Sequence, residues 1–222
     1  MRYLWFGLSV ILLVSACMPT PTPTTTVVPT PVATLAPGTL DAFRKAEQAY
    51  NAGNLDQAIE FYTEVITLSP QYADAYYNRA IAYEDKDDLD QAIADYTRAI
   101  EIDPKYVRAI YNRGILYYRQ GKTDQAIADF TKAIELAPGS PKPYNNRGIA
   151  YEDKGDLDRA IADYTKAIEI DPNFALAYLN RGQVYRIRNL KEQAIADFQK
   201  YLELDKTTPH RNEIEQWIRE LQ

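Results

Sequence analysis

Apolar residues recur every three or four positions along most of this chain, which is the spacing of a helix face. Residues 73–106 show the unit most clearly. The first half of this stretch places three residues on one stripe, Tyr76, Ala80 and Tyr83. The second half carries another stripe, made of Ala92, Ile93, Tyr96, Ala99 and Ile100. Pro104 follows and stops the second helix. The pattern therefore predicts two amphipathic helices joined by a short turn.

The turn between the two helices has a signature that occurs five times. Its central residue is of a type that tolerates the left-handed backbone ending a helix: Gly53, Asp87, Gly121, Gly155 and Asn189. An acidic residue follows three positions later and suits the positive start of the next helix: Asp56, Asp90, Asp124, Asp158 and Glu192. We therefore expect five copies of the helix pair.

The copies follow one another at a fixed interval of 34 residues. Prolines mark it at Pro70, Pro104, Pro138 and Pro172, and alanines at Ala58, Ala92, Ala126, Ala160 and Ala194. A small residue lies at the centre of each first helix and permits close helix packing: Ala46, Ala80, Gly114, Gly148 and Gly182. A helix–turn–helix unit of this length resembles the tetratricopeptide repeat. The resemblance implies an all-α, right-handed superhelix (an α-solenoid) of five repeats, at 39–72, 73–106, 107–140, 141–174 and 175–208.

Residues 209–222 follow the fifth repeat and predict one more helix. Thr208-Pro209-His210 is expected to open it, with the proline in the first turn. Its apolar stripe is Ile214, Trp217, Ile218 and Leu221. We interpret this helix as a cap that covers the last repeat, since solenoid ends need a polar outer face. A helix that docks on a partner is the alternative.

An arginine and an aspartate recur together in repeats two to five. The arginines are Arg79, Arg113, Arg147 and Arg181, and the aspartates are Asp95, Asp129, Asp163 and Asp197. The first repeat has Lys45 and Phe61 at these places, so both members change together. We predict a bidentate contact between the two helices of each repeat, which is architecture rather than a binding site.

The N-terminus has the layout of a secretory signal. Arg2 precedes an apolar run that ends at Val14, too short to span a bilayer as a helix, and small residues lead to Cys17. Leu13-Val14-Ser15-Ala16-Cys17 resembles a bacterial lipobox. That resemblance implies cleavage after residue 16 and a covalent diacylglycerol and acyl lipid on Cys17. An ordinary secretory signal and an uncleaved anchor are the alternatives.

Residues 17–38 would then form a lipidated, flexible linker. Beyond Cys17 the linker is uncharged and rich in Pro and Thr, which favours extended polyproline II. The chain has a net charge of −6, and loss of Arg2 with the signal makes it −7. Because no block of Lys or Arg interrupts this acidity, nucleic acid is disfavoured as a partner. Cys17 is the only cysteine, so the fold has no disulfide.

Nothing in the sequence favours catalysis or metal binding. His210 is the only histidine and lies in the predicted cap, so no histidine cluster or triad can form. Each glycine of the repeats falls at a repeat position, and no phosphate-binding loop is present. We expect a non-enzymatic protein with no catalytic residues, no metal, no cofactor other than the lipid on Cys17, and no small-molecule substrate.

The tetratricopeptide resemblance implies a binding groove along the first helices, which that family places on the concave face. Apolar, aromatic, amide and basic residues of repeats two to five would line it: Tyr77, Asn78, Ile81, Arg108, Tyr111, Asn112, Ile115, Tyr118, Lys142, Asn145, Asn146, Ile149, Leu179 and Asn180. Four of the asparagines, at 78, 112, 146 and 180, would form a ladder able to pair with a peptide backbone. Asparagine is also common there in the family, which leaves a purely structural role open.

We therefore expect a membrane-anchored scaffold or adaptor that captures a protein or peptide segment outside the cytoplasm. It would lie at the outer membrane if the host has one, since Met18 follows the cysteine, and otherwise on the outer face of the cytoplasmic membrane. A holdase-like chaperone for secreted proteins and a self-assembling spacer are the alternatives, and a homo-oligomer stays open.

Overall fold

A computed structural model describes residues 35–222 of the chain. The predicted signal, Cys17 and nearly all of the 17–38 linker lie outside the described residues. Residues 35–222 form eleven helices and no strand: α2 (Thr39–Asn51), α3 (Leu55–Leu68), α4 (Ala73–Asp85), α5 (Leu89–Ile102), α6 (Val107–Arg119), α7 (Thr123–Leu136), α8 (Pro141–Asp153), α9 (Leu157–Ile170), α10 (Ala175–Ile187), α11 (Lys191–Leu204) and α12 (Arg211–Leu221).

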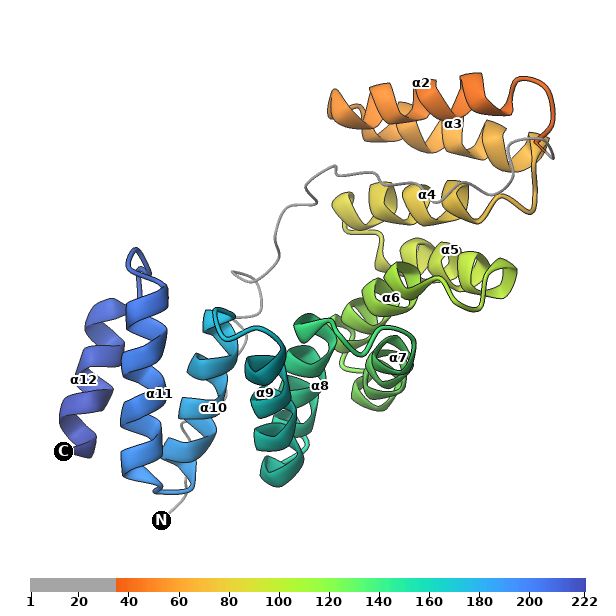
Figure 1. Ribbon diagram of the computed structural model, residues 1–222. Helices are drawn as coiled ribbons and strands as arrows, with labels where there is room; N and C mark the ends of the chain where they lie inside the picture. The colour runs from red at the N-terminus through yellow and green to blue at the C-terminus, as the bar shows by residue number, and fades with distance from the viewer. Residues whose placement is uncertain (1–34) are drawn as a thin grey trace, which may run out of the picture. The chain divides into compact units, whose positions relative to one another are not determined.

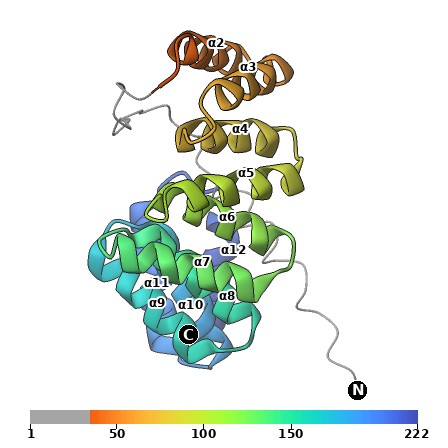
Figure 2. The same ribbon diagram turned by 90° about the vertical axis from the view of Figure 1, so that its right-hand side faces the viewer.

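The helices pack as five hairpins in chain order (Figure 1). Each hairpin joins a first helix to a second one, from α2 with α3 to α10 with α11. The second helix of each hairpin then packs against the first helix of the next. Figure 2 shows the early hairpins stacked from α2 to α5. An isolated hairpin would leave an apolar face exposed to water, and stacking against the neighbouring hairpin buries this face.

The turns inside the hairpins adopt the predicted left-handed backbone. All five central residues have positive φ, including the two that are not glycine, Asp87 at 59° and Asn189 at 57°. Two of the second helices also receive a side-chain cap, because Asp88 and Asp156 accept bonds from the backbone N–H groups of Gln91 and Arg159 at 3.3 and 3.1 Å. The turn prediction is confirmed.

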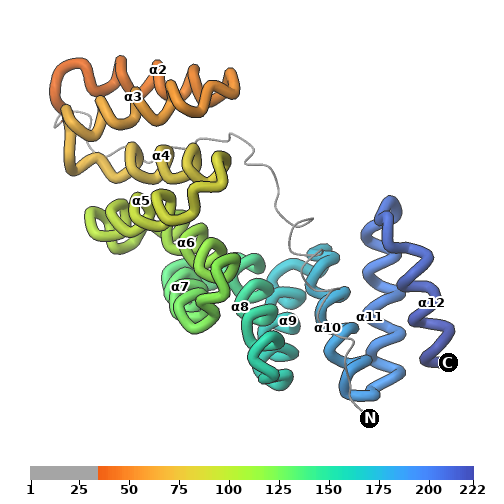
Figure 3. Tube along the Cα trace, turned by 180° about the vertical axis from the view of Figure 1, so that it is seen from behind, coloured from red at the N-terminus to blue at the C-terminus, as the bar shows by residue number. Residues whose placement is uncertain are grey.

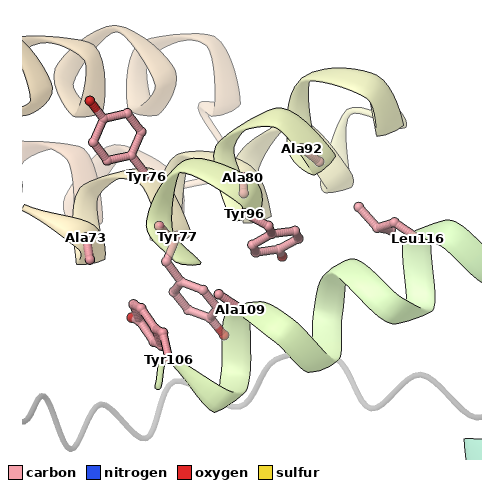
Figure 4. Close-up of a cluster of buried hydrophobic side chains, with 10 residues drawn as sticks. Ala73, Tyr76, Tyr77, Ala80, Ala92, Tyr96, Tyr106, Ala109 and Leu116 are labelled. Carbon is pink, nitrogen blue, oxygen red and sulfur yellow. The ribbon is translucent and has the colours of Figure 1, made fainter. Parts of the chain in front are cut away.

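The core is built from aromatic rings set against small residues. Figure 4 shows the part around repeats two and three, where Tyr77 stacks on Tyr106 with ring centroids 5.0 Å apart. The close approach of paired helices explains the small residue at the centre of each first helix. A Cβ added at Gly148 would lie 2.6 Å from Cε1 of Tyr164, so the ring occupies that space.

The predicted Arg–Asp contacts are present in all four repeats. Each arginine donates from Nε and Nη2 to the two carboxylate oxygens of its aspartate at 2.7–2.8 Å. The same guanidinium donates from Nη1 to a threonine of the preceding repeat at 2.8–3.0 Å: Thr63, Thr97, Thr131 and Thr165. Each arginine therefore ties together three helices from two repeats, a link that the sequence prediction did not include.

Both ends of the array lack this link. In the first repeat Lys45 pairs with Asp41 on its own helix at 2.8 Å, and both side chains are about half exposed. In the fifth repeat Gln199 takes the place of the threonine. The first and last repeats therefore carry other residues at the positions that form this link inside the array.

The last helix, α12, packs on α11 as the predicted cap (Figure 3). Ile214 is fully buried, and the Trp217 ring lies 5.5 Å from that of Phe198. Its predicted start was wrong, because the helix begins at Arg211 and leaves Pro209 before the first turn. The cause is Thr208, whose buried hydroxyl accepts a bond from Tyr201 at 2.8 Å and holds the chain in a separate turn.

Among the helices of residues 35–222, none combines the length and the apolar character that a membrane span needs.

Candidate protein-binding surface

The predicted groove residues lie on one side of α4, α6, α8 and α10, which we call the first-helix face. These helices contact one another directly, since α8 touches both α6 and α10. Arg108 and Lys142 are exposed on this face. Nine more predicted residues are half-buried there: Asn78, Ile81, Tyr111, Asn112, Ile115, Tyr118, Asn146, Ile149 and Asn180.

The remaining three predicted residues are buried, and their placement on the surface was wrong. Tyr77 is 9% exposed beneath Tyr106, Asn145 is 1% exposed and Leu179 is 1% exposed. All three occupy the same repeat position. Tyr77 stacks on Tyr106 and Asn145 accepts a bond from Asn180 of the next repeat, whereas Leu179 belongs to the last first helix. These three side chains therefore lie beneath the surface and do not line the first-helix face.

The asparagine ladder is present but is already bonded on one side. Asn112 donates from Nδ2 to the Tyr77 hydroxyl at 3.4 Å, Asn146 to Tyr111 at 3.0 Å, and Asn180 to Asn145 at 3.0 Å. Asn78 donates to its own helix. At least one N–H of each amide is therefore engaged inside the array, so the ladder is only partly free to pair with a peptide backbone. No bond among residues 35–222 reaches the Oδ1 atoms of Asn78, Asn112 and Asn180, so these acceptors stay available.

An isoleucine row runs along the middle of the face. Ile81, Ile115 and Ile149 stand at the same position of three successive repeats, and each is half-buried. The fifth repeat continues the row with Gln183. These isoleucines therefore keep part of their apolar side chains accessible to solvent on this face.

Two cations stand at the N-terminal end of the face. The guanidinium carbon of Arg108 lies 5.1 Å from the Tyr77 ring centre and 5.6 Å from that of Tyr106. Neither Arg108 nor Lys142 has a carboxylate within ion-pair distance among residues 35–222. A cation in the first turn opposes the helix dipole, so these two side chains do not stabilise their own helices.

A second set of contacts, which we call the terminal pairs, lies at the C-terminal end of the face. At three successive junctions the last-but-one residue of a first helix contacts the last residue of the next first helix, 35 positions on. Tyr50 donates to Asp85 at 2.5 Å, Arg119 Nη1 lies 3.8 Å from Glu84 Oε1, and Tyr118 donates to Asp153. These pairs were not predicted from the sequence, although the chain shows a tyrosine or an acidic residue followed by a polar residue 35 positions later.

Two carboxylates at this end are partly removed from water. Burial raises the pKa of Glu84 and of Glu152, although each accepts a bond from a tyrosine hydroxyl of its own repeat. The donors are Tyr96, at 3.0 Å from Glu84, and Tyr164, at 2.8 Å from Glu152. An ionised carboxylate in such a place is stabilised by a nearby cation. Arg119 supplies one to Glu84.

Within 35–222 no group of three or more His, Cys, Asp or Glu side chains is arranged to hold a metal ion. The face instead presents an apolar centre, amide acceptors, cations at one end and carboxylates at the other. Such a surface suits recognition of another chain.

Models of the tetratricopeptide repeat match the chain from residue 47 to 196. One matches residues 73–106, 107–140 and 141–174, a second matches 47–87 and a third matches 163–196. The chain belongs to the tetratricopeptide repeat family. No curated protein sequence matches it.

Solved tetratricopeptide proteins share the fold. A crystal structure of MamA has 26% identity and a TM-score of 0.70 over 76% of this chain and 92% of its own. MamA from Desulfovibrio magneticus RS-1, residues 41 to the end, has 18% identity and a TM-score of 0.73, with 79% and 99% covered. YrrB, described as a TPR protein with an unusual peptide-binding site, has 20% identity and a TM-score of 0.69, with 80% and 92% covered.

Proposed function

We propose that this tetratricopeptide protein is a non-enzymatic scaffold that holds a segment of another protein on its first-helix face. The isoleucine row carries the proposal. Ile81, Ile115 and Ile149 are half-buried in three successive repeats. Ile81 and Ile149 pack partly against the core, and each of the three still keeps apolar surface accessible. Apolar side chains that stay accessible in register on a folded array mark an interaction surface.

The surroundings of the row fit a peptide segment. Amide acceptors at Asn78, Asn112 and Asn180 can accept backbone N–H groups, while apolar side chains of the segment cover the isoleucines. YrrB supports this use of the fold, since it is described as having a peptide-binding site. Its likeness to this chain is one of fold, so the residues of this face carry the assignment.

The ends of the array argue against a spacer that grows by stacking copies end to end. Internal junctions use an arginine and a threonine from neighbouring repeats. The first repeat has Lys45 where the arginine belongs, and α12 covers the other end. An end-to-end junction could not repeat the internal one, which favours capture of a partner.

We propose further that the scaffold acts outside the cytoplasm on a lipid anchor. The support is the lipobox-like Val14-Ser15-Ala16-Cys17 after a short apolar run. Two or more acyl chains hold a protein stably at a membrane, and one does not. Changing Cys17 to Ser should move the protein out of the membrane fraction. An unchanged fractionation would refute the anchor and leave the binding face untouched.

The binding proposal is tested by photo-crosslinking in living cells. A photo-reactive residue replaces Lys142 on the first-helix face or Lys166 on α9. Both lysines are exposed, and they lie on the first and second helices of the same repeat. We expect discrete adducts with another protein from position 142 and none from position 166. Many adducts from position 142 would indicate a holdase instead. Equal adducts from both positions, or only adducts of the protein with itself, would refute the scaffold.

A further inference from the structure

The terminal pairs follow one register through the array, and three of the four are polar contacts. Tyr50 with Asp85 and Tyr118 with Asp153 are hydrogen bonds between neighbouring repeats. Between them, Glu84 meets the guanidinium of Arg119. The register then sets Glu152 of α8 opposite the last residue of α10, Ile187.

The second pair shows how the fold treats a half-buried glutamate at this place. Arg119 Nη1 lies 3.8 Å from Glu84, and its Nη2 lies 2.8 Å from Asp87, which belongs to the same repeat as Glu84. Glu84 also accepts the Tyr96 hydroxyl bond. The chain itself thus supplies a cation to this carboxylate.

The fourth pair has the glutamate and the tyrosine but no cation. Glu152 accepts from Tyr164 as Glu84 does from Tyr96, and Asp153 beside it accepts from Tyr118. No ion pair among residues 35–222 involves Glu152 or Asp153. Arg186, next to Ile187 in sequence, is turned away and lies 4.2 Å from the Trp217 ring centre.

Ile187 is itself unusual, because it is 57% exposed and is one of the few large apolar residues so exposed. It stands where Arg119 stands two repeats earlier. By the register of the terminal pairs, Glu152, which pairs with no cation of residues 35–222, therefore lies opposite an exposed apolar side chain on the first-helix face. The aliphatic stem of a Lys or Arg can cover an apolar side chain while its charged end reaches a carboxylate.

We propose that the partner segment places a lysine or arginine between Glu152 and Ile187, where the chain lacks the counterpart of Arg119. This inference rests on the proposed function, since it names the chemistry of the segment that the first-helix face holds. The partner's cation meets Glu152, and its stem covers Ile187. The exposed Arg108 and Lys142 at the other end of the face favour an acidic or neutral residue there, which orients the segment.

The test selects peptides from a phage-displayed library of random dodecamers. The full chain, extracted from membranes in detergent and immobilised, is compared with three variants: Glu152→Gln, Ile187→Arg and the matched control Glu84→Gln. Both glutamine variants keep an acceptor for their tyrosine. Ile187→Arg supplies the missing cation from within the chain. Thermal unfolding of each variant checks that it is folded.

Peptides selected on the natural chain should share a Lys or Arg at one position. This preference should vanish with Glu152→Gln and with Ile187→Arg and persist with Glu84→Gln. A selected peptide should bind the Glu152→Gln variant about tenfold more weakly, or about 1.4 kcal/mol.

Two results would overturn the inference in different ways. Peptides that are enriched without a shared basic position, or whose basic position survives Glu152→Gln, refute the role of Glu152 and leave the scaffold standing. Failure to enrich any peptide on the natural chain refutes the binding face, and with it this inference.

Discussion

Arg119 lies 3.8 Å from Glu84 of the preceding repeat, and the residue that repeats its position two units later is Ile187. The same backbone register therefore carries a filled ion-pair position at one junction and an unfilled one at another. A substitution inside the chain can fill the second position.

Ile187→Arg should stabilise the protein through Glu152. A guanidinium at position 187 would reach a half-buried carboxylate across the repeat junction, with a coupling energy of about 0.5–1 kcal/mol. Gly155 replaces the Asp87 that also contacts Arg119, so the gain should stay modest. A double-mutant cycle with Glu152→Gln, measured by urea unfolding, gives this energy. If Ile187→Arg changes the free energy of unfolding equally in the natural chain and in the Glu152→Gln variant, positions 152 and 187 do not interact, which would contradict this account.

The stability of the protein should depend on pH through Glu152. Burial raises the pKa of this carboxyl above its ordinary value of 4.5, so the folded state holds the proton more tightly than the unfolded state does. The loss of folding free energy caused by burying the charged carboxylate is complete at pH values above the raised pKa. It disappears as the pH falls through the raised pKa toward 4.5. Glu152→Gln should therefore be more stable than the natural chain at pH 7, by a margin that narrows on acidification. A constant margin between pH 7 and 4 would be inconsistent with this cause.

Asp163→Ala should be strongly destabilising. Arg147 donates two bonds of 2.8 Å to Asp163 and a third of 3.0 Å to Thr131, so its charge would stay largely buried with only a hydroxyl for a partner. Removal of one member of such a pair costs about 3 kcal/mol. Asp41→Ala, which breaks exposed pairs with Arg44 and Lys45, should cost under about 1 kcal/mol. Similar losses in the two variants, measured by urea unfolding, would contradict the structural role of the internal pair.

Much of this architecture could be predicted because each feature is local. The turn residues, the small residue at each helix centre and the Arg–Asp pair recur at 34-residue intervals, and each belongs to one hairpin. The binding face depends instead on contacts between hairpins. Tyr77, Asn145 and Leu179 share a helix side with surface residues but are buried, and for Tyr77 and Asn145 the next repeat provides the covering contact. Contacts between hairpins likewise engage an amide N–H of Asn112, Asn146 and Asn180.

Trp217→Ala should loosen the cap and promote self-association. The Trp217 ring lies against Phe198 and carries Arg186 on its face, so its loss uncovers the end of the fifth repeat. Truncation of a large packed aromatic costs about 3 kcal/mol. Light scattering should show larger species for this variant, while Gln216→Ala, on the exposed side of α12, stays like the natural chain. A variant that scatters like the natural chain and keeps its stability would show that α12 does not serve as a cap.

The most direct test of the scaffold is the affinity of a partner captured from position 142, once purified. The dissociation constant is measured for the full chain and for two double variants that each remove two half-buried isoleucines from the same repeats. Ile115→Ala with Ile149→Ala alters the first-helix face, and Ile134→Ala with Ile168→Ala alters the second helices. We expect the first pair to weaken binding by about tenfold or more, or about 1.4 kcal/mol, and the second pair to leave it unchanged. Equal affinity for the two double variants would contradict the assignment of the first-helix face as the binding surface.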